Sequence, residues 1–318
     1  MKRILPVVAL ALVALLPATV HAAFPGRNGA IVYGSGFETL VGFDQGGDVS
    51  LYTWSISVRH GSATQVLATC HQELDAPQCP TGIGGYYSEP AVSPDGTLVA
   101  FHAGASLAIA DISGHDVQIL PPQTDRVGEP AFSPSGTRLV FTRGSTTISH
   151  DSIASLWTSD IAGEHPQLLT GDGSQASWSV RNWIAFKRSD GGLYRVRPDG
   201  HGLRLLVHSG LAPTWSPDGT RLAFARPAVR RHHEIIRKGG IYVMDGDGRR
   251  LHRLAGRAAR VTAQDLAWSP DGRKLLVLGD DRLVTMNLNG HLLHRFAWAA
   301  TDETSERWTT SVDWQSLP

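Results

Sequence analysis

The chain has 318 residues, and its 29 basic side chains balance its 29 acidic ones. This balance provides no electrostatic attraction for nucleic acid or for an anionic membrane surface, so neither is expected as a partner. The length would ordinarily suggest about two domains, but no Pro- or Ser-rich linker divides the sequence.

Residues 1–22 predict a signal peptide that is removed on export. Lys2 and Arg3 form a basic start, residues 4–16 are an apolar run, and the small residues Val20 and Ala22 occupy the positions that cleavage requires. The apolar run is shorter than the roughly 20 residues that a membrane-spanning helix needs. We therefore expect a periplasmic or secreted protein with no transmembrane segment after processing.

A short unit recurs along the rest of the chain. Residues 212–224 read APTWSPDGTRLAF, residues 89–101 read EPAVSPDGTLVAF, and residues 129–141 read EPAFSPSGTRLVF. Residues 266–277 give a further copy, LAWSPDGRKLLV, and residues 176–186 give a degraded one. The large residue before each turn marks a copy, and successive markers lie 37–53 residues apart: Val92, Phe132, Trp178, Trp215, Trp268 and Trp314. Self-similarity at this period predicts a repeat architecture.

Each copy predicts four antiparallel strands. Pro, Asp and Gly suit a tight turn, because Pro fixes φ, Asp bonds the backbone ahead and Gly accepts positive φ. The run after the turn, such as residues 98–101, is apolar on both faces, as expected for a strand whose sheet is covered on both sides. Each copy continues with a third apolar run, for example residues 241–245, and then with a short fourth run, for example residues 204–206 in another copy. Four strands per period predict one blade of a β-propeller.

The two ends of the chain predict one shared blade. Phe24 takes the marker position of a first copy, and Trp314 takes the same position near the C-terminus. Residues 312–314 would supply the innermost strand of this blade and residues 30–33 the next strand. The fold class is therefore all-β: residues 23–318 are expected to form a single six-bladed β-propeller of four-stranded antiparallel blades, closed by pairing of the N- and C-terminal strands.

The first blade carries an insertion at residues 70–87, which holds the only two cysteines, Cys70 and Cys79. In an exported protein, this pair predicts a disulfide that closes the loop. The alternative is a metal site, for which His71 is the one nearby histidine and a second cysteine pair is missing. No metal ion or other cofactor is predicted.

The repeated Trp and Asp residues are interpreted as architectural. A large ring on the strand nearest the axis can wedge between neighbouring blades. An Asp in each tight turn can accept backbone N–H groups, whereas a calcium site would need several oxygens around one ion. The residues concerned are Trp178, Trp215, Trp268 and Trp314, and Asp95, Asp218 and Asp271.

The position three residues before each marker is the candidate binding site. It lies at the start of the innermost strand, so these side chains are expected to face one another at a mouth of the central channel. The residues are Glu89, Glu129, Gln175, Ala212, Asp265 and Ser311. Converging polar groups in a concave place predict a binding site, and the alternative is a water-filled entrance with no function. Carboxylates held close together would also shift each other's pKa.

A basic insertion in the fifth blade is the second candidate for contact with a partner. Its residues are Arg230, Arg231, His232, His233, Arg237 and Lys238. It is interpreted as an exposed hairpin loop, which could dock an acidic partner. It is not a zinc-protease motif, since no second His follows at helical spacing. His291 and His294 are expected to face solvent.

Two segments carry a resemblance to a known family. Residues 215–224, WSPDGTRLAF, and residues 241–248, IYVMDGDG, look like the TolB-type, WD40-like propeller repeat of bacteria. The resemblance covers residues 24–318 and implies the fold. The same blade serves scaffolds, transport-associated periplasmic proteins and the lids of prolyl oligopeptidase-like hydrolases. Because the first blade directly follows the predicted leader, we expect neither the α/β domain of TolB nor a hydrolase domain, so a Tol–Pal role and peptidase activity do not follow.

Two functions remain open. The first is a non-catalytic, monomeric scaffold in the cell envelope that binds a protein or peptide; no nucleophile motif and no phosphate-binding loop is present. The alternative is a small propeller hydrolase or lyase that acts on a carbohydrate or ester through carboxylates that face the channel.

Overall fold

The structure is a computed structural model of the chain, and it describes residues 25–44, 47–72, 87–121, 126–144, 154–227, 229–231, 234–237, 239–260, 263–279, 282–296 and 305–317. The predicted signal peptide and Cys79, His232, His233 and Lys238 lie outside the described residues. The leader and the Cys70–Cys79 disulfide therefore stay predictions.

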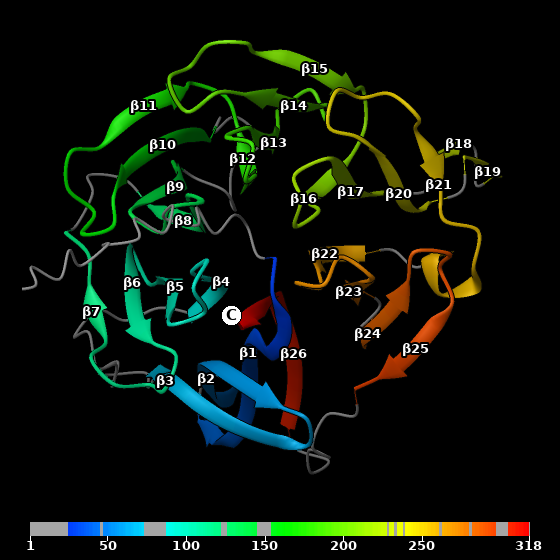
Figure 1. The fold of residues 1–318 in the computed structure, drawn as a ribbon. Helices are drawn as coiled ribbons and strands as arrows, with labels where there is room; N and C mark the ends of the chain where they lie inside the picture. The colour runs from blue at the N-terminus through cyan, green and yellow to red at the C-terminus, as the bar shows by residue number, and fades with distance from the viewer. Residues whose placement is uncertain are drawn as a thin grey trace, which may run out of the picture.

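Six four-stranded antiparallel sheets stand in a ring around a common axis (Figure 1). Each sheet is one blade, and the blades are numbered from the one that contains both chain ends. From the axis outward, blade 1 has β26 (Ser305–Leu317), β1 (Arg27–Asp44), β2 (Gly47–His60) and β3 (Ala63–Gln72). Blade 2 has β4 (Tyr87–Val92), β5 (Leu98–Ala103), β6 (Ser106–Asp111) and β7 (Gln118–Ile119). Blade 3 has β8 (Val127–Phe132), β9 (Arg138–Arg143), β10 (Ser155–Asp160) and β11 (Gln167–Thr170).

The other three blades have the same arrangement. Blade 4 has β12 (Ser174–Trp178), β13 (Ile184–Lys187), β14 (Leu193–Val196) and β15 (Arg204–Val207). Blade 5 has β16 (Leu211–Trp215), β17 (Arg221–Arg226), β20 (Gly240–Asp245) and β21 (His252–Arg253). Blade 6 has β22 (Ala263–Trp268), β23 (Lys274–Gly279), β24 (Arg282–Asn287) and β25 (Leu292–Arg295). The predicted six-bladed propeller is confirmed.

The hydrophobic core lies between the blades. The second strand of a blade is apolar on both faces because both faces are covered: Val99, Phe101, Leu222 and Phe224 are all fully buried. One core cluster joins residues of blade 5, such as Ala223, to residues of blade 6. A blade therefore depends on its neighbours for burial, and an open ring would expose the apolar faces of two sheets.

Blade 1 closes the ring by pairing the two ends of the chain. In the antiparallel pair of β1 and β26, Ile31 lies opposite Trp314 and Tyr33 lies opposite Val312, as predicted. The innermost strand β26 contacts both β4 and β22, the innermost strands of the two adjacent blades. The side-chain amide of Gln315 also donates a 2.9 Å hydrogen bond to the carbonyl oxygen of Gly96 in blade 2. These contacts hold the C-terminal strand in place on both sides.

The strands of blade 1 are much longer than the sequence predicted. The sequence predicts an innermost pair that spans only residues 30–33 and 312–314, but β1 has 18 residues and β26 has 13. The local signal is weak because Gly34, Gly36 and Gly42 have low β-propensity. Pairing of β1 with both β2 and β26 satisfies its backbone groups and overrides that propensity.

The structure also gives the bounds of the strands in and around the two predicted insertions. In blade 5, β18 (Val229–Arg231) and β19 (Glu234–Arg237) form a two-stranded hairpin, which confirms the predicted hairpin in the basic insertion. The insertion in blade 1 is shorter than predicted, because Cys70 belongs to β3 and Tyr87 begins β4. A short 3-10 helix, η1 (Arg257–Arg260), was not predicted. Within the described ranges, no helix has the length and apolar character of a membrane span.

Candidate functional site at the channel mouth

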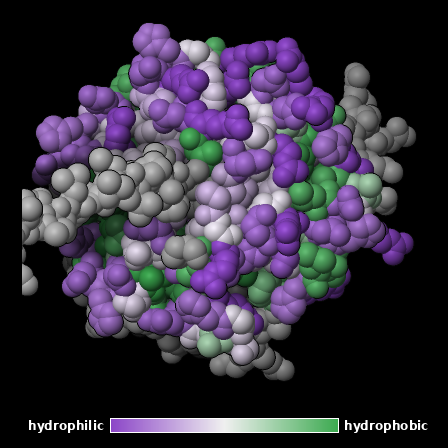
Figure 2. All heavy atoms as spheres, viewed as in Figure 1, coloured by the Kyte–Doolittle hydropathy of each residue, from purple (hydrophilic) through white to green (hydrophobic). Residues whose placement is uncertain are grey.

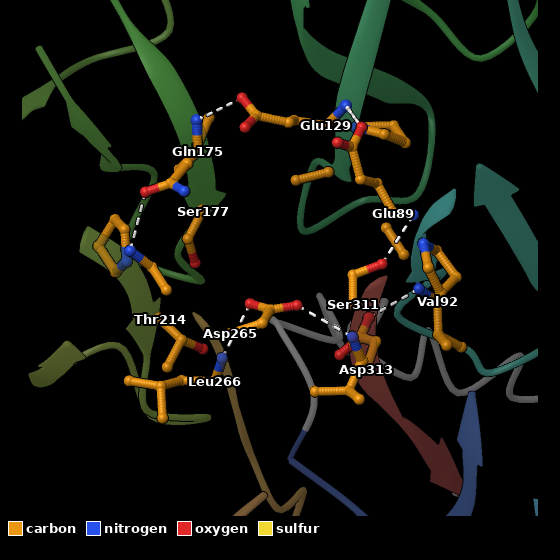
Figure 3. Close-up of a pocket in the computed structure, with 18 of the residues that line it drawn as sticks. Glu89, Val92, Glu129, Gln175, Ser177, Thr214, Asp265, Leu266, Ser311 and Asp313 are labelled. Atoms are coloured by element: carbon orange, nitrogen blue, oxygen red, sulfur yellow. Dashed lines mark hydrogen bonds between the residues drawn. The ribbon is translucent and has the colours of Figure 1, made fainter. Parts of the chain in front are cut away.

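The innermost strands of all six blades line a cavity of about 220 Å³ on the ring axis. Figure 3 looks into this cavity and shows polar side chains from different blades pointing toward one another. All six residues of the predicted channel mouth line it: Glu89, Glu129, Gln175, Ala212, Asp265 and Ser311. The structure therefore brings together six residues that occupy the same position in successive copies of the repeat.

Four of these residues adopt a left-handed backbone conformation. The φ angles of Glu89, Glu129, Gln175 and Ala212 lie between 48° and 56°, a region that L-residues rarely occupy. The pairing register of the innermost strand shifts at each of these positions, as in a β-bulge. A bulge redirects a side chain away from the normal alternation of a strand, which lets these side chains reach the next blade.

The redirected side chains form a chain of hydrogen bonds around the mouth. Glu89 Oε2 accepts the backbone N–H of Glu129 at 2.6 Å, and Glu129 Oε2 accepts the backbone N–H of Gln175 at 2.6 Å. Gln175 Oε1 then accepts the N–H of Ala212 at 3.0 Å. Because the Ala212 side chain has no acceptor atom, this series of hydrogen bonds, as far as the described residues show it, stops between blades 5 and 6. The mouth is therefore asymmetric.

The bonds resume on the other side of this gap. Asp265 Oδ2 accepts the backbone N–H of Val312 at 2.9 Å, and Ser311 Oγ accepts the N–H of Glu89 at 2.7 Å (Figure 3). Each acceptor therefore joins its own blade to the following one. The sequence predicted that these side chains converge, but it did not predict that each one bonds the neighbouring backbone.

Asp313 is a site residue that the sequence analysis missed. It lines the same cavity, and its Oδ2 accepts the N–H of Val92 at 2.8 Å, which ties blade 1 to blade 2. A signal was present in the sequence: Asp313 directly precedes the marker Trp314, and the residues at that position in the other copies are all uncharged, namely Ala91, Ala131, Ser177, Thr214 and Ala267.

The carboxyl groups of the mouth bind protons more tightly than usual. Burial, followed by the charge of Glu89, raises the pKa of Glu129 to about 7, and burial also raises the pKa of Glu89. Burial raises the pKa of Asp265 to about 7 and that of Asp313 to about 6. The backbone N–H bonds act in the opposite direction but are outweighed. Among the described residues that line the cavity, four are acidic and none is basic.

His102 lies behind this acidic cluster and was also missed. Its Nδ1 is 3.2 Å from Ser88 Oγ, and its Nε2 is 2.6 Å from the carbonyl oxygen of Gly104. Burial lowers the pKa of His102 to about 4, so its ring is neutral at physiological pH. The Cβ of any larger residue at Gly128 would lie 2.8 Å from Glu89 Oε2, so the close approach of blades 2 and 3 requires glycine there.

The architectural interpretation of the repeated Trp residues is supported by their contacts. The indole N–H of Trp215 donates to the carbonyl oxygen of Ser177 in blade 4, and that of Trp268 donates to the carbonyl oxygen of Thr214 in blade 5. Both rings are nearly buried. These Trp residues therefore wedge against the preceding blade, as predicted.

The turn aspartates also behave as predicted. Asp95 Oδ1 accepts bonds from the Ser93 hydroxyl at 2.6 Å and from the Thr97 N–H at 3.1 Å, and Asp218 repeats this arrangement in blade 5. Burial would raise the pKa of Asp95, but these hydrogen bonds outweigh it and lower the pKa.

The remaining candidates lie away from the mouth. The basic insertion belongs to the β18–β19 hairpin between β17 and β20, and its role in contacting a partner stays a prediction. His291 and His294 are exposed, as expected. Among the described residues, Asp160, Glu164 and His165 lie close enough to share a metal ion, but His165 already pairs with Asp160 at 2.9 Å on the surface.

Solved structures show what the architecture resembles. TolB from Acinetobacter baumannii matches 89% of this chain and 67% of its own, with a TM-score of 0.58 and 14% identity. A putative TolB from Agrobacterium tumefaciens matches 88% of this chain and 98% of its own, with a TM-score of 0.60 and 14% identity. The chain has the fold of a TolB-like propeller. The nidogen/laminin complex matches equally well in shape, with a TM-score of 0.59 at 10% identity over 90% of this chain and 100% of that chain.

These likenesses concern the fold alone. No known family model matches the sequence, and no curated protein is significantly similar to it. The similarity to TolB therefore concerns the propeller fold, and the function depends on the residues of this chain's own site.

Proposed function

We propose that the protein is an exported, non-catalytic propeller scaffold of the bacterial cell envelope, and that its channel mouth binds a protein or peptide partner through a cationic group. The observation that carries the proposal is the acidic cavity on the ring axis, with four carboxyl groups and no basic side chain among its described lining residues. A Lys or Arg side chain of a partner would supply a positive charge, which these buried carboxyl groups do not receive from the described lining of the cavity.

The size of the cavity supports a protein or peptide ligand. Pockets for small molecules usually enclose roughly 300–1,000 Å³, whereas this cavity has about 220 Å³. That volume suits one or two side chains of a partner whose remaining surface rests on the face of the ring. The predicted signal peptide supports a place in the periplasm or outside the cell.

The alternative, a hydrolase or lyase, has weaker support. A pKa near 7, as for Glu129 and Asp265, is compatible with acid or base catalysis. However, both carboxyl groups already accept backbone N–H bonds from the next blade, which commits them to holding the ring. These hydrogen bonds between neighbouring blades explain why the carboxyl groups lie at the channel mouth, without any catalysed reaction.

The test is a selection of displayed random peptides on the mature protein, followed by affinity measurements on Glu129→Gln. A glutamine side-chain oxygen can still accept the bonds from Gln175 and Thr142, so the variant should fold. The matched control is Glu164→Gln, which removes a carboxylate from an exposed position. We expect enriched peptides to contain Lys or Arg, with affinity about tenfold lower in Glu129→Gln and unchanged in the control.

The proposal fails if no peptide is enriched, or if Glu129→Gln binds the peptides as tightly as the wild type does. Turnover of an ester or carbohydrate substrate that disappears in Glu129→Gln would establish the enzymatic alternative instead.

A further inference from the structure

A second cavity lies between blades 4 and 5, away from the channel mouth. It encloses about 450 Å³, twice the volume of the axial cavity. Gly219 and Gly246 line it, and both belong to turns. These turns lie at the ends of the strands that are farthest from the channel mouth. In Figure 2, strongly hydrophilic side chains gather over the part of the ring where blades 4 and 5 adjoin.

Arginine is the characteristic residue of this cavity. Four arginines line it against two acids: Arg181, Arg195, Arg221 and Arg250, with Asp245 and Asp247. The acids are already paired. Asp245 accepts Arg250 Nε at 2.7 Å, and Asp247 lies 3.1 Å from Arg249. Positive charge is therefore in excess around the cavity.

The central guanidinium group, that of Arg195, is held in a fixed position. Its Cζ lies 4.2 Å from the centre of the Trp183 ring, and its Nη1 donates a 2.5 Å bond to the carbonyl oxygen of Gly246 in blade 5. Arg197 stacks on the same ring at 3.9 Å. These contacts orient the guanidinium group before any ligand arrives, which reduces the entropy lost on binding.

The charge of Arg195 is incompletely compensated. Its Nε is buried and donates to no acceptor within the described part of the chain. Burial, and then the nearby charge of Arg204, lower the pKa of Arg195 despite the attraction of Asp247. At the edge of the cavity, the exposed Arg181 uses its Nε for the carbonyl oxygen of Asp218. Among the described residues, the terminal nitrogens of Arg181 donate no hydrogen bond.

We propose that this arginine pocket, formed by Arg181, Arg195 and Arg250 beside Trp183, binds a small oxyanion, the phosphate or carboxylate group of a ligand. Guanidinium groups recognise such planar or tetrahedral oxyanions through paired N–H donors. The pocket is independent of the channel mouth, since it has the opposite charge and lies at the opposite ends of the strands.

The test is a titration of the mature protein with inorganic phosphate and, separately, with glucuronate, with sodium chloride adjusted to keep the ionic strength constant. Tryptophan fluorescence reports binding, and the signal should be smaller in Trp183→Phe, in which Trp215 is the one described tryptophan left in the lining of the cavity. We expect saturable binding of at least one anion. Arg181→Gln should weaken it about tenfold, the loss expected for a charge-assisted hydrogen bond. The two anions distinguish a phosphate ligand from a sugar acid.

Arg273→Gln is the matched control, because it removes one exposed arginine from blade 6. It should leave the affinity unchanged. Arg195→Lys keeps the positive charge but loses the paired N–H donors. If this variant keeps the melting temperature of the wild type, it should also bind the anion more weakly. If the variant unfolds, the result for Arg181→Gln decides. The proposal is overturned if neither anion saturates, or if Arg273→Gln weakens binding as much as Arg181→Gln does.

Discussion

Replacement of Trp314 by alanine should break the closure of the ring. Trp314 lies on the innermost strand of blade 1, is 6% exposed, and stands opposite Ile31 in the pairing of the two chain ends. It packs in a cluster that joins β1 and β26 to blade 6, including Tyr33 and Leu276. Its indole N–H also donates a 3.3 Å bond to the carbonyl oxygen of Gly29.

Two estimates of the cost agree. A buried Trp removes on the order of 200 Å² from water, which at about 25 cal/mol per Å² gives roughly 5 kcal/mol as an upper value. Measured Trp→Ala substitutions in cores cost about 3–5 kcal/mol. At about 2 °C per kcal/mol for a domain of this size, the melting temperature should fall by roughly 6–10 °C.

The assay is thermal unfolding followed by circular dichroism, combined with amide hydrogen exchange. Trp157→Ala is the matched control, because it removes the same ring from a half-buried position on β10, the third strand of blade 3. Both variants should lose stability, but only Trp314→Ala should accelerate exchange along β1 (Arg27–Asp44), whose partner strand it loosens. A role of Trp314 in closing the ring is refuted if Trp314→Ala melts within about 2 °C of the wild type, or if exchange in β1 is unchanged.

Three further predictions concern the closure, pH and the cysteines. Gly96→Ala places a Cβ 2.1 Å from the carbonyl oxygen of Ser316, whereas Gly200→Ala has a similar φ (83° against 74°) and its Cβ has no atom of the described residues within 4 Å. In urea unfolding, Gly96→Ala should therefore be the less stable variant, and equal stabilities would count against a tight contact there. Because the folded-state pKa values of Glu129 and Asp265 are raised to about 7, the folded protein retains protons that the unfolded chain has released, so the urea midpoint should fall as pH rises from 6 to 8. Glu129→Gln should reduce this dependence, and a midpoint that rises over the same range would contradict it. The pKa of His102, lowered from 6.5 to about 4, acts in the opposite direction at the lower end of this range, because the unfolded imidazole still binds protons there, but the two raised carboxyl groups outweigh this one side chain. Finally, the mature protein should show no thiol that reacts with an alkylating reagent until it is reduced, and labelling of Cys70 in the unreduced, unfolded chain would exclude the predicted disulfide.

The sequence by itself determined the architecture, because the signals for a propeller are local and repeated. The turn residues around Asp95 and Asp218, the marker before each turn and the apolar run after it recur at blade length, so each copy reports the same four strands. The position of Trp314 relative to Phe24 also predicted which strands close the ring, because both ends carry part of the same unit. The repeat alone placed the polar residues of the mouth together.

The tertiary structure decided what those residues do. The bonds from Glu89 to the backbone of Glu129, and from Asp313 to Val92, join residues 40 and 221 positions apart. No local pattern encodes the left-handed bulges, the long strands of blade 1 or the arginine pocket, because each depends on how neighbouring blades approach one another. The raised pKa of Glu129 has the same origin, since burial by adjacent blades, and not its own sequence neighbours, removes water from its carboxyl group.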